Sequence, residues 1–240
     1  DTLVFARRDI QTAFIPSFIK IIGPYSFNHW VLLTKVEYSS NCKLEIIGED
    51  AFSDISIESI KIPASVTTIE RCTFSVCESL KEFEIPENSN LLSIGECALM
   101  DASIESLLIP SKLKTFKDRW CHFTSYLKNI SIMEDNKLFK IYDRFVIGKS
   151  DENQENFDFL LFAARDIKIA YIPNFIEIIK SDAFNDCNEL HSVEFEDESK
   201  LRIIEKEAFS FTGIVDIYLP KHLKQIDYQA FRRCDDLLNV

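Results

Sequence analysis

The residues that could act as nucleophiles, general bases or metal ligands are the seven cysteines and four histidines of the chain. The histidines are spread along the sequence, at His29, His122, His191 and His222. None stands in an HExxH motif, and there is no GxSxG, GxGxxG or Walker A sequence. Because a catalytic centre needs such groups to converge, the sequence favours a protein that is not an enzyme and holds no cofactor or metal.

Two cysteine–histidine pairs are close enough in sequence to suggest chemistry. Cys187 and His191 are four residues apart, a spacing that could place two ligands on one metal. Cys121 and His122 are adjacent, as a nucleophile and its base could be. Both cysteines, however, fall at apolar positions of the repeat described next, so we expect them to pack in a core.

The elements that would position these side chains belong to an internal repeat. A bulky anchor residue recurs at intervals of 25, 22, 25, 22, 63, 25 and 22 residues. The anchors are Phe27, Phe52, Phe74, Leu99, Cys121, Phe184, Phe209 and Phe231. A unit of 22 or 25 residues is too short to bury its own apolar stripe, so successive units must stack. We expect the anchors to form an aromatic row.

Each repeat also contains a strand signal. Two alternating apolar positions follow the anchor, as in Ile60/Ile62 and Ile217/Leu219, and proline often ends the segment. An apolar pair three residues apart precedes the anchor, as in Leu44/Ile47. The pattern predicts a solenoid that is mostly β, with parallel short strands, one per 22–25-residue repeat.

The consensus IPxxVxxIxxxAFxxCxxLxxIxIP is clearest at residues 62–86 and 172–195. It resembles the BspA-type leucine-rich repeat of oral and gut bacteria and of mucosal protist parasites, and the composition leans toward the protist type. The resemblance implies a leucine-rich repeat solenoid in a cell-surface or secreted adhesin or antigen. Its partner would be a host-cell, matrix or microbial surface protein or glycan. The alternative is an intracellular scaffold or adaptor that binds a cytosolic protein.

A longer repetition sets the expected domain boundaries. The passage at residues 5–22 returns at 162–179, after 157 residues. We therefore expect 1–14 to be the tail of a preceding β-insert, 15–132 and 172–240 to be repeats, and 133–171 to be a β-hairpin insert, all in one continuous solenoid. Two interpretations of the insert stay open: a spacer that bends the solenoid, or a flap that takes part in recognition.

Cys72 and Cys97 lie two residues before their anchors in consecutive repeats. Stacking would bring their Cα atoms near the range of about 4.4–6.8 Å that a disulfide tolerates. The spacing permits either a bridge or two free thiols.

The net charge of −12 provides no electrostatic basis for binding nucleic acid. No apolar run approaches the roughly 20 residues of a membrane-spanning helix, and the first residues lack the layout of a signal peptide. We expect no membrane span in this fragment.

Residues between the inward apolar positions of the strands are expected to face solvent and to offer a binding surface. The candidates are Lys35, Glu37, Lys61, Glu82, Glu84, Leu108, Glu194, Asp216 and Tyr218. Acidic residues outnumber basic ones, which suits a basic protein patch or a cation-bridged glycan. The alternative is that these charges only keep the sheet soluble. Leu108 and Tyr218 are the expected apolar exceptions and the first candidates for anchoring contacts.

Overall fold

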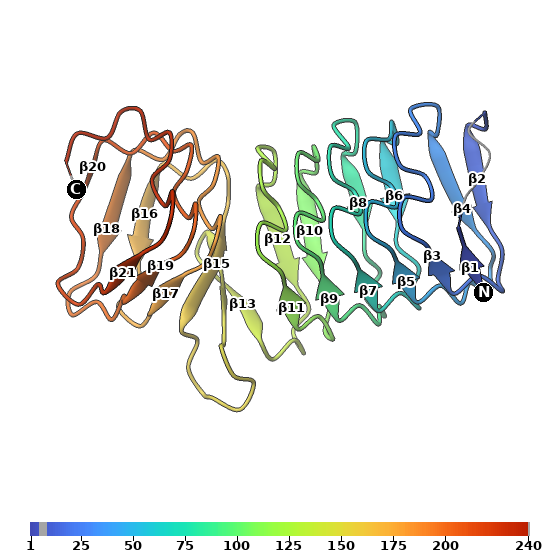
Figure 1. The fold of residues 1–240 in the computed structure, drawn as a ribbon. Helices are drawn as coiled ribbons and strands as arrows, with labels where there is room; N and C mark the ends of the chain where they lie inside the picture. The colour runs from blue at the N-terminus through green and yellow to red at the C-terminus, as the bar shows by residue number, and fades with distance from the viewer. Residues whose placement is uncertain (5–8, 240) are drawn as a thin grey trace. The chain divides into compact units, whose positions relative to one another are not determined.

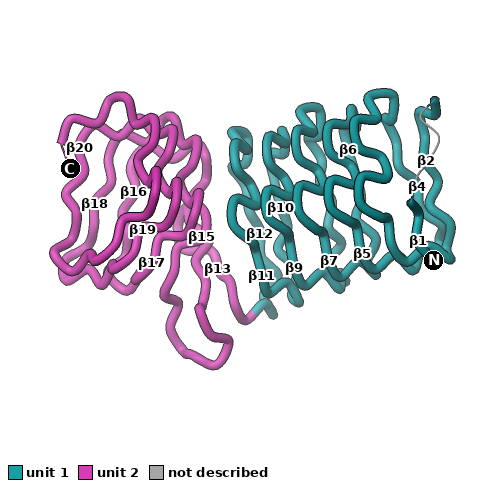
Figure 2. The backbone as a smooth tube through the Cα atoms, in the orientation of Figure 1, with its two compact units in different colours: residues 1–136 teal, residues 137–240 magenta. Residues whose placement is uncertain are grey.

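The computed structural model of the protein describes residues 1–4 and 9–239; residues 5–8, in the expected tail of an insert, and residue 240 lie outside it. The chain forms two compact units, residues 1–136 and 137–240 (Figures 1 and 2). Each unit is a stack of coils built from short strands and turns. Among the described residues there is no helix, and so none that could span a bilayer. The continuity of the two units as one solenoid stays a prediction.

Unit 1 has two sets of parallel strands on opposite sides of its coils (Figure 1). One set is a six-stranded sheet of two-residue strands, in the order β1 (Thr2–Leu3), β3 (Ile21–Ile22), β5 (Ile46–Ile47), β7 (Thr68–Ile69), β9 (Ser93–Ile94) and β11 (Thr115–Phe116). The other set holds the longer strands β2 (Thr12–Ile15), β4 (Lys35–Tyr38), β6 (Ser59–Lys61), β8 (Glu82–Glu84), β10 (Ser106–Ile109) and β12 (Asn129–Ile132). The longer strands pair as β2–β4, β6–β8 and β10–β12.

Unit 2 begins with the predicted β-insert. Strands β13 (Phe139–Tyr142) and β14 (Phe145–Gly148) form an antiparallel hairpin, and β15 (Phe159–Ala163) adds a third antiparallel strand. The sheet then continues in parallel through β17 (Ile178–Ile179), β19 (Ile203–Ile204) and β21 (Gln225–Ile226). The longer strands β16 (Ile169–Ile172), β18 (Ser192–Phe195) and β20 (Asp216–Ile217) form a second parallel sheet. The β14–β15 loop projects beyond the coils of this unit (Figure 1).

Two details of the expected organisation need correction. Most coils carry two strands rather than one. The second is a two-residue strand at the end of the apolar pair before each anchor, and it was not predicted because it is too short to show alternation. All but the last residue of strands β2 and β16 lies in the expected insert tail or insert, yet these strands pair in parallel with β4 and β18. Ala13, Ile15, Ala170 and Ile172 point inward from these strands and are buried, so both boundaries were placed too late.

The predicted aromatic row forms the core of each unit. In unit 1, Phe27 stacks on Phe52 with ring centroids 4.9 Å apart, and Phe52 stacks on Phe74 at 5.4 Å. In unit 2, Phe184 stacks on Phe209 at 4.7 Å, and Phe209 stacks on Phe231 at 5.3 Å. The rings are nearly parallel, since the interplanar angles are between 2° and 11°. Apolar burial along this row is the main force that holds consecutive coils together.

The turns around the anchors have a conformation that the sequence does not reveal. Residues two positions before and two positions after each anchor have positive φ, and none of these residues is glycine. Around Phe52 they are Asp50 and Asp54, with φ of 51° and 54°. The backbone N–H groups of Asp50, Phe52 and Asp54 donate hydrogen bonds to carbonyl groups of the next coil at 2.9–3.0 Å. The hydrogen bonds between coils therefore offset the steric cost of the left-handed conformation.

Candidate functional site

The first candidate site is the outward side of the longer strands, which we call the strand face of each unit. In unit 1 it includes the predicted residues Lys35 and Glu37 of β4, Lys61 of β6, and Glu82 and Glu84 of β8, all of which are exposed. Their strands lie side by side (Figure 1). The alternation of buried and exposed residues along each strand places these side chains on one surface.

The remaining predicted residues are placed less uniformly. Glu194 of β18 is exposed and Tyr218, directly after β20, is 82% exposed. Asp216 is half-buried, and its Oδ1 accepts a hydrogen bond from Asn239 Nδ2 at 2.6 Å. Leu108 was expected to be an exposed apolar residue, but it is half-buried in β10, which weakens it as an anchor for a partner.

Charges on the strand face of unit 1 are partly neutralised within the protein. Lys35 Nζ lies 2.5 Å from Glu37 Oε1. Lys61 and Glu84 are directly opposite each other in the β6–β8 register and form an ion pair. These side chains are about half to two-thirds exposed, so each pair contributes little to stability, and both remain accessible to a partner.

Two exposed aromatic residues on the strand faces were missed by the sequence analysis. Phe14 of β2 is 60% exposed, and Tyr171 of β16 is 56% exposed. They lie beside Glu37 and Glu194, respectively, in the parallel registers. The sequence could have indicated both residues. Their segments end in AFIP and AYIP, the same apolar–X–Ile–Pro pattern that ends other predicted strands.

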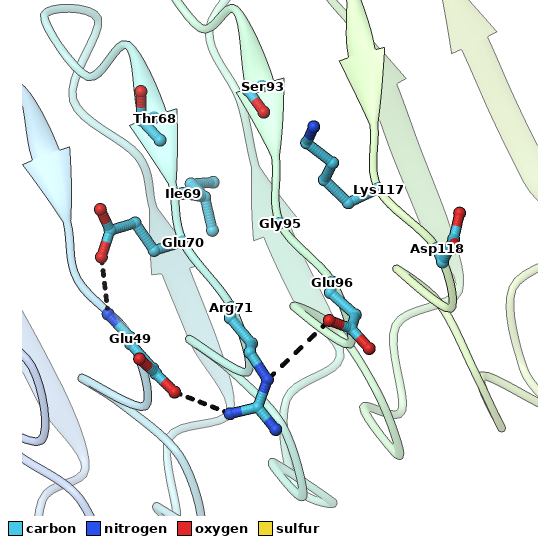
Figure 3. A pocket seen from close by; sticks show the side chains of 10 residues that line it. All are labelled: Glu49, Thr68, Ile69, Glu70, Arg71, Ser93, Gly95, Glu96, Lys117 and Asp118. Carbon is cyan, nitrogen blue, oxygen red and sulfur yellow. Dashed lines mark hydrogen bonds and ion pairs between the residues drawn. The ribbon is translucent and has the colours of Figure 1, made fainter.

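The second candidate site is a shallow open groove of about 730 Å³ over the two-residue strands of unit 1 (Figure 3). It is lined by four acidic side chains, two basic side chains and several small or apolar residues: Glu49, Thr68, Ile69, Glu70, Arg71, Ser93, Gly95, Glu96, Lys117 and Asp118. This groove was not predicted from the sequence. The sequence feature that could have indicated the groove is an acidic residue that recurs one or two positions after the apolar pair of several repeats, as in Glu49, Glu70 and Glu96.

Arg71 ties three coils together across this groove. Its Nη1 lies 2.7 Å from Glu49 Oε1, and its Nε lies 4.0 Å from Glu96 Oε2 (Figure 3). The hydrogen bond to Glu49 is the main reason that the pKa of Arg71 is raised. Glu70 accepts a hydrogen bond from the backbone N–H of Glu49 at 3.1 Å. The arrangement can hold polar ligands by charge, but its lining includes no histidine or cysteine.

The spaced pair Cys187 and His191 differ in burial. Cys187 is fully buried, and burial raises the pKa of its thiol. His191 is exposed, and its Nδ1 lies 3.2 Å from the carbonyl oxygen of Glu189. Cys121 is also buried, as expected for a residue in an anchor position.

Cys72 and Cys97 are both buried, and neither forms a disulfide. The two side chains are close enough to interact by hydrogen bonding, which confirms the predicted stacking of their positions. Burial is the main reason that the pKa of Cys72 is raised, while nearby Arg71 acts in the opposite direction. A thiol of raised pKa is a poor nucleophile near neutral pH.

Comparison with known proteins agrees with this architecture. The BspA type leucine rich repeat region matches residues 2–128 and 151–240, in six copies. The crystal structure of the pneumococcal vaccine antigen PcpA has a TM-score of 0.86 and 26% identity, over 95% of this chain and 55% of that chain. No curated protein matches the chain in sequence.

Two further solved structures share the fold. A leucine-rich repeat protein from Eubacterium ventriosum has a TM-score of 0.80 and 21% identity, over 96% of this chain and 59% of that one. A leucine rich cell surface protein from Faecalibacterium prausnitzii has a TM-score of 0.66 and 21% identity, over 95% of this chain and 72% of that one. The chain thus spans little more than half the length of PcpA and of the E. ventriosum protein. With its repeats, its aromatic row and a family match over most of its length, the chain belongs to the BspA-type leucine-rich repeat family.

Proposed function

We propose that this chain is a non-enzymatic binding part of a cell-surface or secreted protein, an adhesin or antigen. Its strand faces would contact a host-cell, matrix or microbial surface protein or glycan. The observation that carries the proposal is the series of exposed side chains repeated in register on neighbouring strands, as in Lys61 beside Glu84 and Tyr171 beside Glu194. Repeat proteins use extended surfaces of this kind for binding.

The physical character of the surface supports a macromolecular partner. The strand faces are series of side chains on parallel strands, and the groove over the opposite sheet of unit 1 is shallow and open. A flat surface gains affinity by covering many side chains at once, whereas a small molecule is better held in a concave pocket. The net charge of −12 would speed association with a basic partner and make it sensitive to salt.

The relatives support a surface location. One similar structure is described as a vaccine antigen and another as a cell surface protein. The second candidate function is an intracellular scaffold, and the observation that favours it is that none of the seven cysteines forms a disulfide, as is usual in a reducing compartment.

Antibody staining of the organism tests the proposal. We expect an antibody raised against this chain to label intact, unpermeabilised cells. Staining that occurs only after permeabilisation would contradict the surface role and support the scaffold.

Binding assays test which surface is used. Purified chain should bind to host cells, to matrix proteins or to microbial cells, and the variant Glu82→Lys/Glu84→Lys should lose most of this binding because it reverses charge on the strand face. Glu96→Lys in the groove is the matched control and should bind normally. Equal loss in both variants would point to net charge rather than to the strand face.

A further inference from the structure

The strand face of unit 2 carries a row of two tyrosines with a carboxylate between them. Tyr171 of β16 is paired with Glu194 of β18 in the parallel register. Val193 pairs with Ile217 of β20. The next residues along the two chains, Glu194 and Tyr218, therefore lie beside each other. Tyr171, Glu194 and Tyr218 therefore lie side by side on three consecutive coils.

The spacing of the row suits a single cationic side chain. Neighbouring strands are about 4.8 Å apart, which separates the two tyrosine Cα atoms by roughly 10 Å. A cation placed above Glu194 would lie within about 6 Å of both rings, the range of a cation–π interaction. Both rings are available for this contact, since Tyr171 is 56% exposed and Tyr218 is 82% exposed.

The charge at the centre of the row is not neutralised by the protein. In the part of the chain that the structure describes, Glu194 forms no ion pair. The equivalent row of unit 1 differs: its aromatic residue is Phe14, its carboxylate Glu37 is paired with Lys35 at 2.5 Å, and Lys61 takes the place of the second tyrosine. Unit 1 thus already holds cations of its own where unit 2 presents an open carboxylate.

A hollow beside Tyr218 extends the negative surface. It has a volume of about 190 Å³, and its lining includes Glu196, Asp197, Glu198, Lys221 and His222. The three acidic groups outnumber the lysine and the histidine, so the hollow carries a net negative charge near neutral pH. A chain segment whose cation rests on the tyrosine row could place a second basic residue here.

We propose that Tyr171, Glu194 and Tyr218 form a clamp for a lysine or arginine side chain of a basic protein segment. This inference rests on the proposed use of the strand face and specifies the chemistry of its partner. The two rings contribute cation–π contacts and exclude water from the cation, while Glu194 supplies the opposite charge. A neutral glycan could hydrogen-bond the carboxylate through its hydroxyl groups but carries no opposite charge to pair with it, which is why the charge pattern favours a basic protein.

The test uses the whole chain and a fluorescent peptide in which four lysines are separated by glycine and serine. The matched peptide carries acetyl-lysine at the same four positions. Binding is measured by anisotropy at low and at physiological salt. We expect the lysine peptide to bind and the acetylated peptide not to bind.

Variants separate the clamp from general attraction. Tyr171→Ala and Tyr218→Ala should each weaken binding by about two- to fivefold, and Glu194→Gln should weaken it at least as much. Tyr171→Phe and Tyr218→Phe keep the rings and should bind like the parent chain. Tyr228→Ala and Glu78→Gln are the matched controls and should have no effect, because both side chains are exposed and neither lies on a strand face. All these residues are exposed, and circular dichroism confirms that each variant is folded.

Several results would overturn the clamp. Tyrosine variants that bind normally, or Glu78→Gln and Glu194→Gln variants that weaken binding equally, would reduce the interaction to net charge. Tyrosine-dependent binding of a neutral oligosaccharide such as mannohexaose, without binding of the lysine peptide, would assign the row to a glycan.

Cell-attachment assays distinguish failure of the clamp from failure of the proposed surface role. If the parent chain attaches to cells and Tyr218→Ala attaches equally well, the clamp is wrong while the surface role stands. If the lysine peptide binds through the tyrosines but no cell or matrix protein is bound, the clamp stands and the surface role fails.

Discussion

Replacing Phe52 with alanine tests the stacking of the coils at the centre of the aromatic row. Phe52 is fully buried, and its ring lies 4.9 Å from that of Phe27 and 5.4 Å from that of Phe74. Replacing a buried phenylalanine with alanine costs about 3–5 kcal/mol in total, lost ring contacts included. Because Phe52 loses two ring pairs, each worth roughly 0.5–1.5 kcal/mol of that total, we expect the free energy of unfolding of unit 1 to fall by the upper part of this range, roughly 4–5 kcal/mol.

Tryptophan fluorescence during urea unfolding measures this change selectively. The chain has two tryptophans, Trp30 and Trp120, and both are buried in unit 1. The control Phe14→Ala removes the same ring from a position that is 60% exposed and should change stability by less than about 0.5 kcal/mol. Phe52→Leu should cost less than Phe52→Ala, because Leu99 already fills the equivalent position two coils later.

The reasoning would be refuted if Phe52→Ala were as mild as Phe14→Ala. It would also fail if Phe52→Leu were as damaging as Phe52→Ala, since the anchor would then act through something other than the volume that it fills between coils.

Three further predictions concern unit 1. Gly95→Ala should destabilise the unit by about 1–3 kcal/mol, because a Cβ there would lie 2.4 Å from the carbonyl carbon of Glu70. An unchanged midpoint of urea unfolding would contradict this close approach. Cys72 and Cys97 should react slowly with a maleimide near neutral pH because both are buried, and mass spectrometry showing labelling as fast as in urea would count against their burial. Stability should decrease as pH rises above 9, because burial raises the pKa of Cys77 from 9.0 to about 12 and only the unfolded chain then loses this proton. The decrease of stability with pH should be shallower in Cys77→Ala. An identical decrease in the variant would show that Cys77 is not its cause.

The aromatic row could be predicted from sequence because it depends on spacing alone. Residues such as Phe52, Phe74 and Phe209 recur at intervals that no single globular core would require, and stacking is the arrangement that buries them all. The inward positions of the longer strands follow in the same way from alternation, as Ile60 and Ile62 show.

Other features could not be predicted because no residue type marks them. The left-handed residues include Tyr25, Cys72 and Arg119, which have no intrinsic preference for positive φ. At Tyr25 and Cys72 the backbone N–H donates a hydrogen bond to the next coil in this conformation. Tyr171 was missed for a different reason: its segment was assigned to an insert, so its place beside Glu194 was not considered.

Carboxylate footprinting tests most directly the central claim that the strand faces are the binding surface. Glu84 on the strand face and Glu96 in the groove have similar side-chain exposure, 58% and 51%, so the free chain should be labelled at comparable rates at both. When the chain is bound to cells or to a purified partner, we expect Glu84 or Glu194 to be protected and Glu96 to be labelled as before. Protection of Glu96, with Glu84 and Glu194 labelled as in the free chain, would contradict the account.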